Sequence, residues 1–315
     1  MPSGFRQLIR RSRRSPLTWR YFFNLGPTLA YKLSHHSLPD ELGRIVKDLN
    51  RNGIAITSVR ALLGRQYALF EELHDAAERL RGRLADEIDA ARKMADELRN
   101  IGAKTFIVPL LGHSPLLDPE SVYARFTLQK PILDVANAYF GMYTRLRYYN
   151  VWYTLKTKSS PRESQLWHFD REDHYILKMF VYLSDVDEQA GPFTYAPGTH
   201  PKGPIRCEPP YFIEHGVRRS SDEQMAEVVP EDRWIKAVGP VGTVVFADTR
   251  GYHKGGLARE RDRFMFVSMF TSPASESREW FKRPESLIPP EDRALAFALA
   301  SGKRGPWLSL RVRPA

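Results

Sequence analysis

The spacing of apolar residues along the first half of the chain predicts helices. Apolar residues there recur at intervals of three and four, which is typical of helices that bury one side. The pattern indicates a helix over about 39–50, a long or broken helix over 66–100, and a third over 119–139 that bends or starts anew near Pro131. Between the first two, the segment "IAIT" predicts a short strand.

The pattern changes after Gly141, where short segments rich in aromatic and β-branched residues are bounded by Gly, Pro, Asp or Ser. Both features are typical of β-strands. The expected strands lie in MYTRLRYYNVWYTLKT, SQLWHFD, YILKMFVYLSDV, PFTYAP, GTVVFADT and RFMFVSMFTS. Helices followed by strands, without regular alternation, argue against a doubly wound parallel sheet. We therefore predict a mainly β, α+β fold: a jelly roll, or double-stranded β-helix, packed against N-terminal helices.

The length of 315 residues and the 42% hydrophobic content are sufficient for one large core. We expect a single domain over 39–290, in which 39–140 is helical and about 141–275 forms the jelly roll. Residues 1–38 are expected to be a basic N-terminal arm and 291–315 a basic C-terminal tail.

The formal charge of +10 is concentrated in the arm, because residues 1–39 contain seven Lys or Arg and no acid, which leaves about +3 for the rest. A basic segment with Trp19, Tyr21, Phe22 and Phe23 could contact an anionic membrane surface or phosphate. The simpler hypothesis is a solvated arm whose aromatic residues dock on the domain.

Cellular location is predicted from two absences in the sequence. No uninterrupted apolar run of 18 residues occurs, so a membrane-spanning helix is not expected. The single cysteine, Cys207, excludes an internal disulfide framework and fits a reducing compartment. We therefore expect a cytoplasmic protein.

Candidate chemistry begins with "WHFD", in which His168 and Asp170 are two residues apart in an expected strand. Alternate side chains of a strand project to the same face, so both could bind one metal ion. About 85 residues later, His253 lies on a turn after another expected strand. Two histidines and one carboxylate are the ligand set of the facial triad that holds Fe(II). Taken alone, the first pair could equally be a polar pair within a strand, and His253 an exposed turn residue.

Arg263 stands ten residues after His253, at the start of the last expected strand. A guanidinium can bind a carboxylate through two parallel hydrogen bonds, which suits an acidic cosubstrate. Arg259 and Arg261 are nearby alternatives, but their positions favour the surface.

The ordered segments "WHFDRED…LKMFVYLSDVDEQAGPFTYAPGTHP…GTVVFADTRGYHKGG…RDRFMF" resemble the phytanoyl-CoA dioxygenase family of Fe(II)/2-oxoglutarate oxygenases over about 141–272. The resemblance implies that His168, Asp170 and His253 bind iron, that Arg263 binds the distal carboxylate of 2-oxoglutarate, and that O₂ is consumed. Gly255 departs from the family's Ser or Thr, which removes a hydroxyl near that carboxylate.

Three further residues lie on strands expected to line the barrel: Asn150, Tyr153 and Lys178. We include Asn150 and Tyr153 with Arg263 as candidate cosubstrate-binding residues.

The resemblance implies hydroxylation of an aliphatic C–H group in a small-molecule or lipid-like metabolite, with decarboxylation of 2-oxoglutarate to succinate. One alternative is a noncatalytic jelly-roll protein that binds a metal or a small acid. Another is a membrane- or nucleic-acid-associated module that acts through the basic arm. We do not expect a specific nucleic-acid partner, because the strands carry no recognisable nucleic-acid-binding motif.

Overall fold

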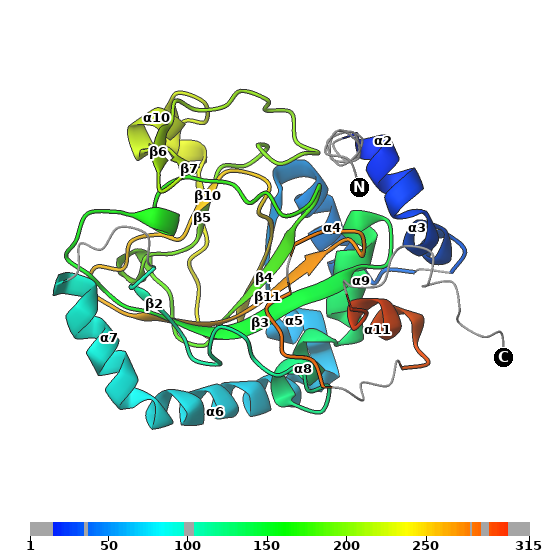
Figure 1. Ribbon diagram of the computed structural model, residues 1–315, viewed down its shortest axis with the longest axis horizontal. Coiled ribbons are helices and arrows are strands. Elements are labelled where there is room, and N and C mark those ends of the chain that lie inside the picture. Colours follow the sequence, from blue (N-terminus) through cyan, green and yellow to red (C-terminus); the bar gives the residue numbers. More distant parts are fainter. Residues whose placement is uncertain (1–14, 35–36, 98–103, 278, 285–289, 302–315) are drawn as a thin grey trace, which may run out of the picture.

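Figure 1 shows the computed structural model of the protein, which describes residues 15–34, 37–97, 104–277, 279–284 and 290–301. The α-helices are α2 (Pro16–Thr18), α3 (Leu25–Lys32), α4 (Asp40–Asn52), α5 (Val59–Leu63), α6 (Ala68–Arg83), α7 (Ala85–Glu97), α8 (Val122–Thr127), α9 (Lys130–Phe140), α10 (Asp222–Ala226) and α11 (Arg293–Ala298). A π-helix, η1 (Trp19–Phe23), joins α2 to α3, and short 3-10 helices are η2 (Gly64–Tyr67), η3 (Glu163–Gln165), η4 (Glu188–Ala190) and η5 (Glu231–Arg233).

The strands fall mainly in the second half of the chain. They are β1 (Ile54–Ser58), β2 (Ile107–Pro109), β3 (Arg145–Thr154), β4 (Leu177–Tyr182), β5 (Thr194–Tyr195), β6 (Phe212–Glu214), β7 (Val217–Arg219), β8 (Ile235–Lys236), β9 (Thr243–Asp248), β10 (His253–Lys254) and β11 (Arg263–Thr271).

Two antiparallel sheets form the central sandwich. The larger has the order β1-β9-β4-β11-β3-β2 and the smaller the order β10-β5-β8. A bridge between His168 and His253 adds residues 167–168 to the edge of the smaller sheet, beside β10. The chain therefore passes between the sheets as β3, 167–168, β4, β5, β8, β9, β10 and β11. This interleaved path is a jelly roll, which confirms the predicted fold.

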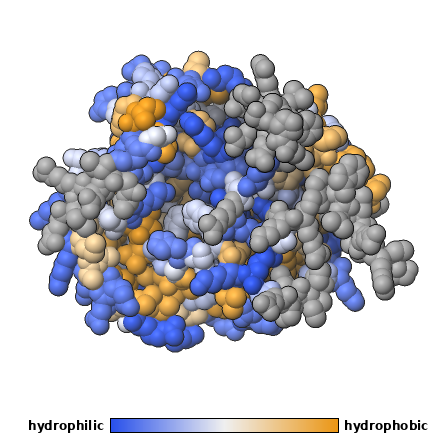
Figure 2. Space-filling view, viewed as in Figure 1, coloured by the Kyte–Doolittle hydropathy of each residue, from blue (hydrophilic) through white to orange (hydrophobic). Residues whose placement is uncertain are grey.

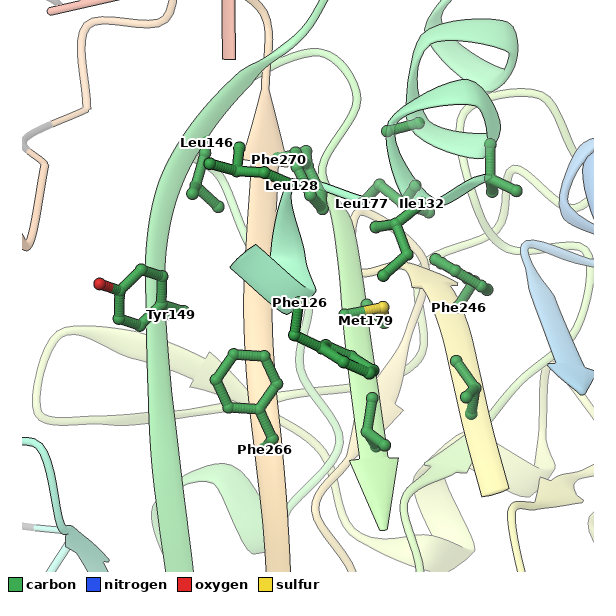
Figure 3. Packing of buried hydrophobic residues seen from close by; sticks show 14 of the residues in the cluster. Phe126, Leu128, Ile132, Leu146, Tyr149, Leu177, Met179, Phe246, Phe266 and Phe270 are labelled. Atoms are coloured by element: carbon green, nitrogen blue, oxygen red, sulfur yellow. The ribbon is translucent and has the colours of Figure 1, made fainter. Parts of the chain in front are cut away.

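Side chains alternate between the two faces of the large sheet, and both faces are buried. In β4, Leu177 and Met179 pack in the cluster that lies under the helices, whereas Phe180 and Tyr182 pack between the two sheets. Figure 3 shows the helix-side cluster, in which Phe126 and other helical residues contact the sheet. Burial of each large apolar side chain contributes roughly 1.5–3 kcal/mol.

The predicted helices are present with the expected interruptions. The long helix breaks at Leu84, which separates α6 from α7. The third predicted helix starts anew, because Pro131 occupies the first turn of α9, where its missing N–H is tolerated. Gly53 ends α4 with φ +82°, and a Cβ atom there would lie 2.3 Å from the Tyr195 hydroxyl oxygen. Glycine at position 53 therefore allows α4 to turn directly into β1.

The terminal segments are described only in part. Residues 1–14 and 35–36 of the predicted arm, and 302–315 of the predicted tail, lie outside the described residues. The rest of the arm forms α2, η1 and α3, which pack on the domain at the right of Figure 1. The domain boundaries and the cytoplasmic location stay predictions. Among the described helices, none is both long and apolar enough to cross a bilayer.

Candidate metal centre

The two histidines of the predicted triad are joined through their backbones. His168 N–H donates to the carbonyl oxygen of His253 (3.0 Å), and His253 N–H donates to that of His168 (2.9 Å). Directly opposed residues of an antiparallel pair project their side chains to the same face. The two imidazole ring centroids accordingly lie 4.3 Å apart.

Asp170 reaches the same point from the loop that follows. Its N–H donates to Thr249 O (2.8 Å), which fixes this loop against the chain that leads to β10. One ligand atom from each of His168, Asp170 and His253 lies within 4.8 Å of the other two. The structure thus brings together three residues that are up to 85 positions apart, in a donor set suited to Fe(II).

Each histidine is oriented by a carbonyl oxygen two residues earlier. His168 Nδ1 lies 2.9 Å from Leu166 O, and His253 Nδ1 lies 3.0 Å from Gly251 O. A carbonyl oxygen can only accept, so Nδ1 carries the proton in each ring. The unprotonated Nε2 is then left as the metal-binding atom, an arrangement typical of histidine ligands.

Burial also favours the neutral, ligating form of both rings. It lowers the pKa of His253 to about 4, and burial together with the neighbouring His253 lowers the pKa of His168 well below its usual range. Both imidazoles are therefore already neutral at neutral pH, so neither ring has to lose a proton before it binds a metal.

Asp170 forms an ion pair with Lys178, whose Nζ lies 2.6 Å from Asp170 Oδ2. Both side chains are largely buried, at 14% and 12% exposure. Burial alone would raise the pKa of Asp170, but the Lys178 ammonium holds that pKa below its usual range. In the same way, burial disfavours the Lys178 cation, but Asp170 keeps the pKa of Lys178 above its usual value. Asp170 is consequently held as a carboxylate.

Arg263 is buried at the start of β11 and faces the space between the sheets, as Met265 and Val267 do further along the strand. Its Nη2 donates to Gly255 O (3.3 Å), while its buried Nε and Nη1 have no hydrogen-bond partner among the described residues. Burial lowers the pKa of Arg263 to about 10, so the guanidinium remains a cation at neutral pH. A buried cation with free donors is suited to an anionic ligand.

Asn150 also lies on the inner face of the large sheet, opposite Val267 of β11. Its amide is engaged by the backbone, since Nδ2 donates to Gly112 O (2.8 Å) and Oδ1 accepts from Leu111 N (3.3 Å). Asn150 therefore anchors the loop after β2, and the structure shows it bound to the backbone instead of to the triad.

Tyr153 is not brought to the triad. It pairs with Phe264 on the helix-covered face of the large sheet, and its hydroxyl donates to Asp262 Oδ2 (2.9 Å). Tyr153 has the opposite strand parity from Asn150, so its side chain lies on the other face of the large sheet.

Arg219 is a neighbour of the triad that sequence analysis missed. The bridge between Trp167 and Ser220 places Arg219 opposite His168, on the inner face of the small sheet. Arg219 is 4% exposed and pairs with Glu163 (Nη2 to Oε2, 3.0 Å), but no described residue forms a hydrogen bond with its buried Nη1. Only the long-range bridge between Trp167 and Ser220, the residue after β7, reveals this position, and no local pattern predicts it.

Asp173 is a structural residue beside the centre. Its Oδ1 accepts from the Trp19 indole N–H (2.7 Å) and its Oδ2 from Ser272 N (2.7 Å). Asp173 therefore ties the N-terminal helices to the loop that follows Asp170.

No known protein family profile matches the sequence, and no curated protein matches it. Solved structures that are similar in fold include the epimerase SnoN in complex with Fe3+, alpha ketoglutarate and nogalamycin RO, at 18% identity, 77% coverage of this chain, 88% of that chain and a TM-score of 0.47. Another is EctD from S. alaskensis with bound Fe, at 17% identity, 79% and 85% coverage and a TM-score of 0.49. A third is EvdO2 from Micromonospora carbonacea var. aurantiaca, at 17% identity, 76% and 93% coverage and a TM-score of 0.45.

These similarities are too distant to assign a family or a substrate to this chain. Membership of the phytanoyl-CoA dioxygenase family therefore stays a prediction. The arrangement of His168, Asp170 and His253 is therefore the basis for assigning a function.

Proposed function

We propose that the chain is an Fe(II)/2-oxoglutarate-dependent dioxygenase that hydroxylates an aliphatic C–H group of a small-molecule or lipid-like metabolite. The observation that carries the proposal is the convergence of His168, Asp170 and His253, whose ligand atoms lie within 4.8 Å of one another. Two neutral histidines and one carboxylate on one side leave the remaining positions of an octahedral ion open.

Arg263 supports 2-oxoglutarate as the acidic cosubstrate. Within the part of the chain that the structure describes, its buried Nε and Nη1 lack an acceptor, and a carboxylate would supply one. In this proposal, Arg263 binds the distal carboxylate and thereby orients the oxo acid toward the three ligands.

When bound, the ferrous ion and 2-oxoglutarate supply the oxidising chemistry, which converts the oxo acid to succinate and CO₂ and transfers an oxygen atom from O₂ to the substrate. The chain provides the surroundings for this chemistry. Lys178 keeps Asp170 ionised, and the Leu166 and Gly251 carbonyls keep Nε2 of each histidine available. The Phe193 ring, 5.4 Å from the His253 ring, helps to exclude water. The retained carboxylate favours hydroxylation over halogenation, because the related halogenases lack it.

Succinate release from 2-oxoglutarate by purified protein tests the proposal, with Fe(II), O₂ and a mixture of metabolites supplied. Mass spectrometry of the mixture would also detect a product that has gained one oxygen. We expect iron-dependent succinate from the wild type and none from His253→Ala or Asp170→Ala. His113→Ala, which changes an exposed histidine, is the matched control and should retain turnover.

Bound iron with no succinate above the level of Asp170→Ala would contradict catalysis. That outcome would favour the alternative in which the jelly roll binds a metal or a small acid without turnover.

A further inference from the structure

The outward side of the N-terminal helical segment consists of large apolar residues. We call this surface the N-terminal apolar face; its members are 37–82% exposed and are Leu17, Tyr21, Phe22, Leu25, Leu29 and Leu33. Figure 2 shows hydrophobic residues gathered at the right edge of the molecule, where Figure 1 places α2 and α3. A helix that is apolar on the side away from its own domain normally has a second apolar environment to contact.

Helix geometry keeps this face continuous. Five of its residues recur at intervals of four, from position 17 to position 33. At 3.6 residues per turn such a row would drift around a regular α-helix. The wider π-helical turn of η1, closed by Asn24 N–H to Trp19 O (3.0 Å), offsets part of that drift.

The inner side of the same segment is firmly docked. The indole N–H of Trp19 donates to Asp173 Oδ1 (2.7 Å), and Arg20 Nη2 donates to Phe140 O (2.9 Å). The side chain of Asn24 accepts from Ala274 N (3.1 Å). These contacts fix the rotation of the helices, so the apolar residues face outward as part of the folded structure.

The net positive charge of the chain lies in the two terminal segments. Residues 1–39 contain seven Lys or Arg and residues 302–315 contain four, with no acid in either, so residues 40–301 carry only −1 of the total +10. The described residues that precede the C-terminal segment pack near α3, because the Tyr143 ring contacts both Tyr31 of α3 (5.6 Å) and Phe297 of α11 (5.1 Å).

We propose that the N-terminal apolar face lies on the surface of an anionic lipid bilayer, with its leucine and aromatic side chains below the headgroups, and that the positive charge of the chain adds electrostatic attraction. Apolar burial and attraction to anionic headgroups are the two contributions to interfacial binding. The proposal does not depend on the function of the metal centre.

Other occupants fit the face less well. Nucleic acid would attract the basic segments but would gain little from exposed leucines. A second copy would bury the leucines but would associate two chains of formal charge +10 each, at a cost from like-charge repulsion. An anionic bilayer complements both features at once.

Vesicle flotation tests the proposal with the full-length, metal-loaded protein. The probes are vesicles of phosphatidylcholine alone and of phosphatidylcholine with 30% phosphatidylserine. We expect binding to the anionic vesicles and a loss of about tenfold for each leucine changed in Leu29→Glu/Leu33→Glu. The control is Met94→Glu/Leu116→Glu, which makes the same charge change at two exposed apolar residues elsewhere and should bind as the wild type does.

Equal binding by wild type and Leu29→Glu/Leu33→Glu would overturn the proposal, as would equal losses in both double variants. Two further results would also overturn it. One is a dimer that Leu29→Glu/Leu33→Glu separates, and the other is nucleic-acid binding that competes with the vesicles while the leucine changes have no effect on either.

A second measurement does not rely on loss of binding. In a Cys207→Ser background, Leu33→Cys and, as a control, Leu116→Cys can each be labelled with an environment-sensitive NBD fluorophore. We expect NBD fluorescence at position 33 to rise with anionic vesicles and fluorescence at position 116 to stay unchanged. No rise at position 33 would contradict insertion of the face.

Discussion

Lys178 Nζ lies 2.6 Å from Asp170 Oδ2, and this ion pair joins the inner face of β4 to a predicted iron ligand. Metal-ligating carboxylates are commonly held by a second residue that fixes their orientation and charge. Here the second residue is itself a cation. In the metal-free protein, Lys178 balances the charge that a ferrous ion would balance in the loaded protein.

Lys178→Met should destabilise the metal-free protein by about 3–5 kcal/mol, because it removes the ammonium that is paired with the largely buried Asp170 carboxylate. Chemical denaturation checks this value. The control is Lys130→Met, since Lys130 forms a pair of the same length with Asp134 but is 83% exposed. That change should alter the free energy of unfolding by no more than about 1 kcal/mol.

Added Co(II) should stabilise Lys178→Met more than it stabilises wild type, because the metal replaces the missing charge. Similar losses in the two variants would contradict this role for Lys178.

Arg263→Gln should weaken 2-oxoglutarate binding to the metal-loaded protein by on the order of 10- to 100-fold, because charge-assisted hydrogen bonds to the carboxylate are lost. Anaerobic calorimetry of 2-oxoglutarate binding measures the change. Arg261→Gln is the matched control, since Arg261 is 65% exposed and pairs with Asp187 at the surface. Unchanged affinity in Arg263→Gln would remove the guanidinium from the cosubstrate site.

Tyr153→Phe should leave 2-oxoglutarate affinity unchanged, because the Tyr153 hydroxyl faces the helices and donates to Asp262. Loss of that hydrogen bond should lower the free energy of unfolding by about 0.5–1.5 kcal/mol. Calorimetry and denaturation of the same preparation separate the two effects. A clear loss of cosubstrate affinity would show that this side chain does reach the centre.

His200 should make the metal-free protein less stable as the pH falls from about 6.5 to 4. Burial lowers the pKa of His200 to about 4, while an unfolded histidine titrates near about 6.5. Between these values the unfolded chain binds the additional proton, so the stability contributed by His200 is present above pH 6.5 and declines toward pH 4, by up to about 1.4 kcal/mol per pH unit.

Asp248 acts in the opposite direction, because burial raises its pKa to about 6 and its contribution declines as the pH rises through that value. The contribution of His200 to the pH dependence of stability is therefore obtained by subtracting the curve of a His200 variant from that of the wild type. Denaturation of His200→Gln over pH 4–7 should give a shallower fall toward acid than the wild type gives. Parallel curves for the two proteins would contradict the prediction.

Part of this structure follows directly from the sequence, and part of it depends on long-range pairing. The change from helical spacing to short aromatic strands predicts the two layers, and the spacing within "WHFD" predicts that His168 and Asp170 lie together. No local pattern requires His253 to lie beside them. Its position there was expected only from the resemblance of the ordered segments to a known family.

The cosubstrate side of the centre was harder to predict because β3 is aromatic on both faces. Tyr148 and Trp152 pack between the sheets, while Tyr149 and Tyr153 pack toward the helices. Hydrophobic alternation therefore does not show which face of β3 is inside. Arg219 was missed for a related reason, because its place opposite His168 is set by the pairing of Trp167 with Ser220, 53 positions later.

Anaerobic titration of the purified protein with Fe(II) tests the central claim most directly. We predict that one ferrous ion binds per chain, that 2-oxoglutarate then binds to the iron-loaded protein only, and that Asp170→Ala and His253→Ala abolish the first step while they remain folded. Failure of the wild type to bind Fe(II), or equal binding by both variants, would contradict the assignment of His168, Asp170 and His253 as an iron site.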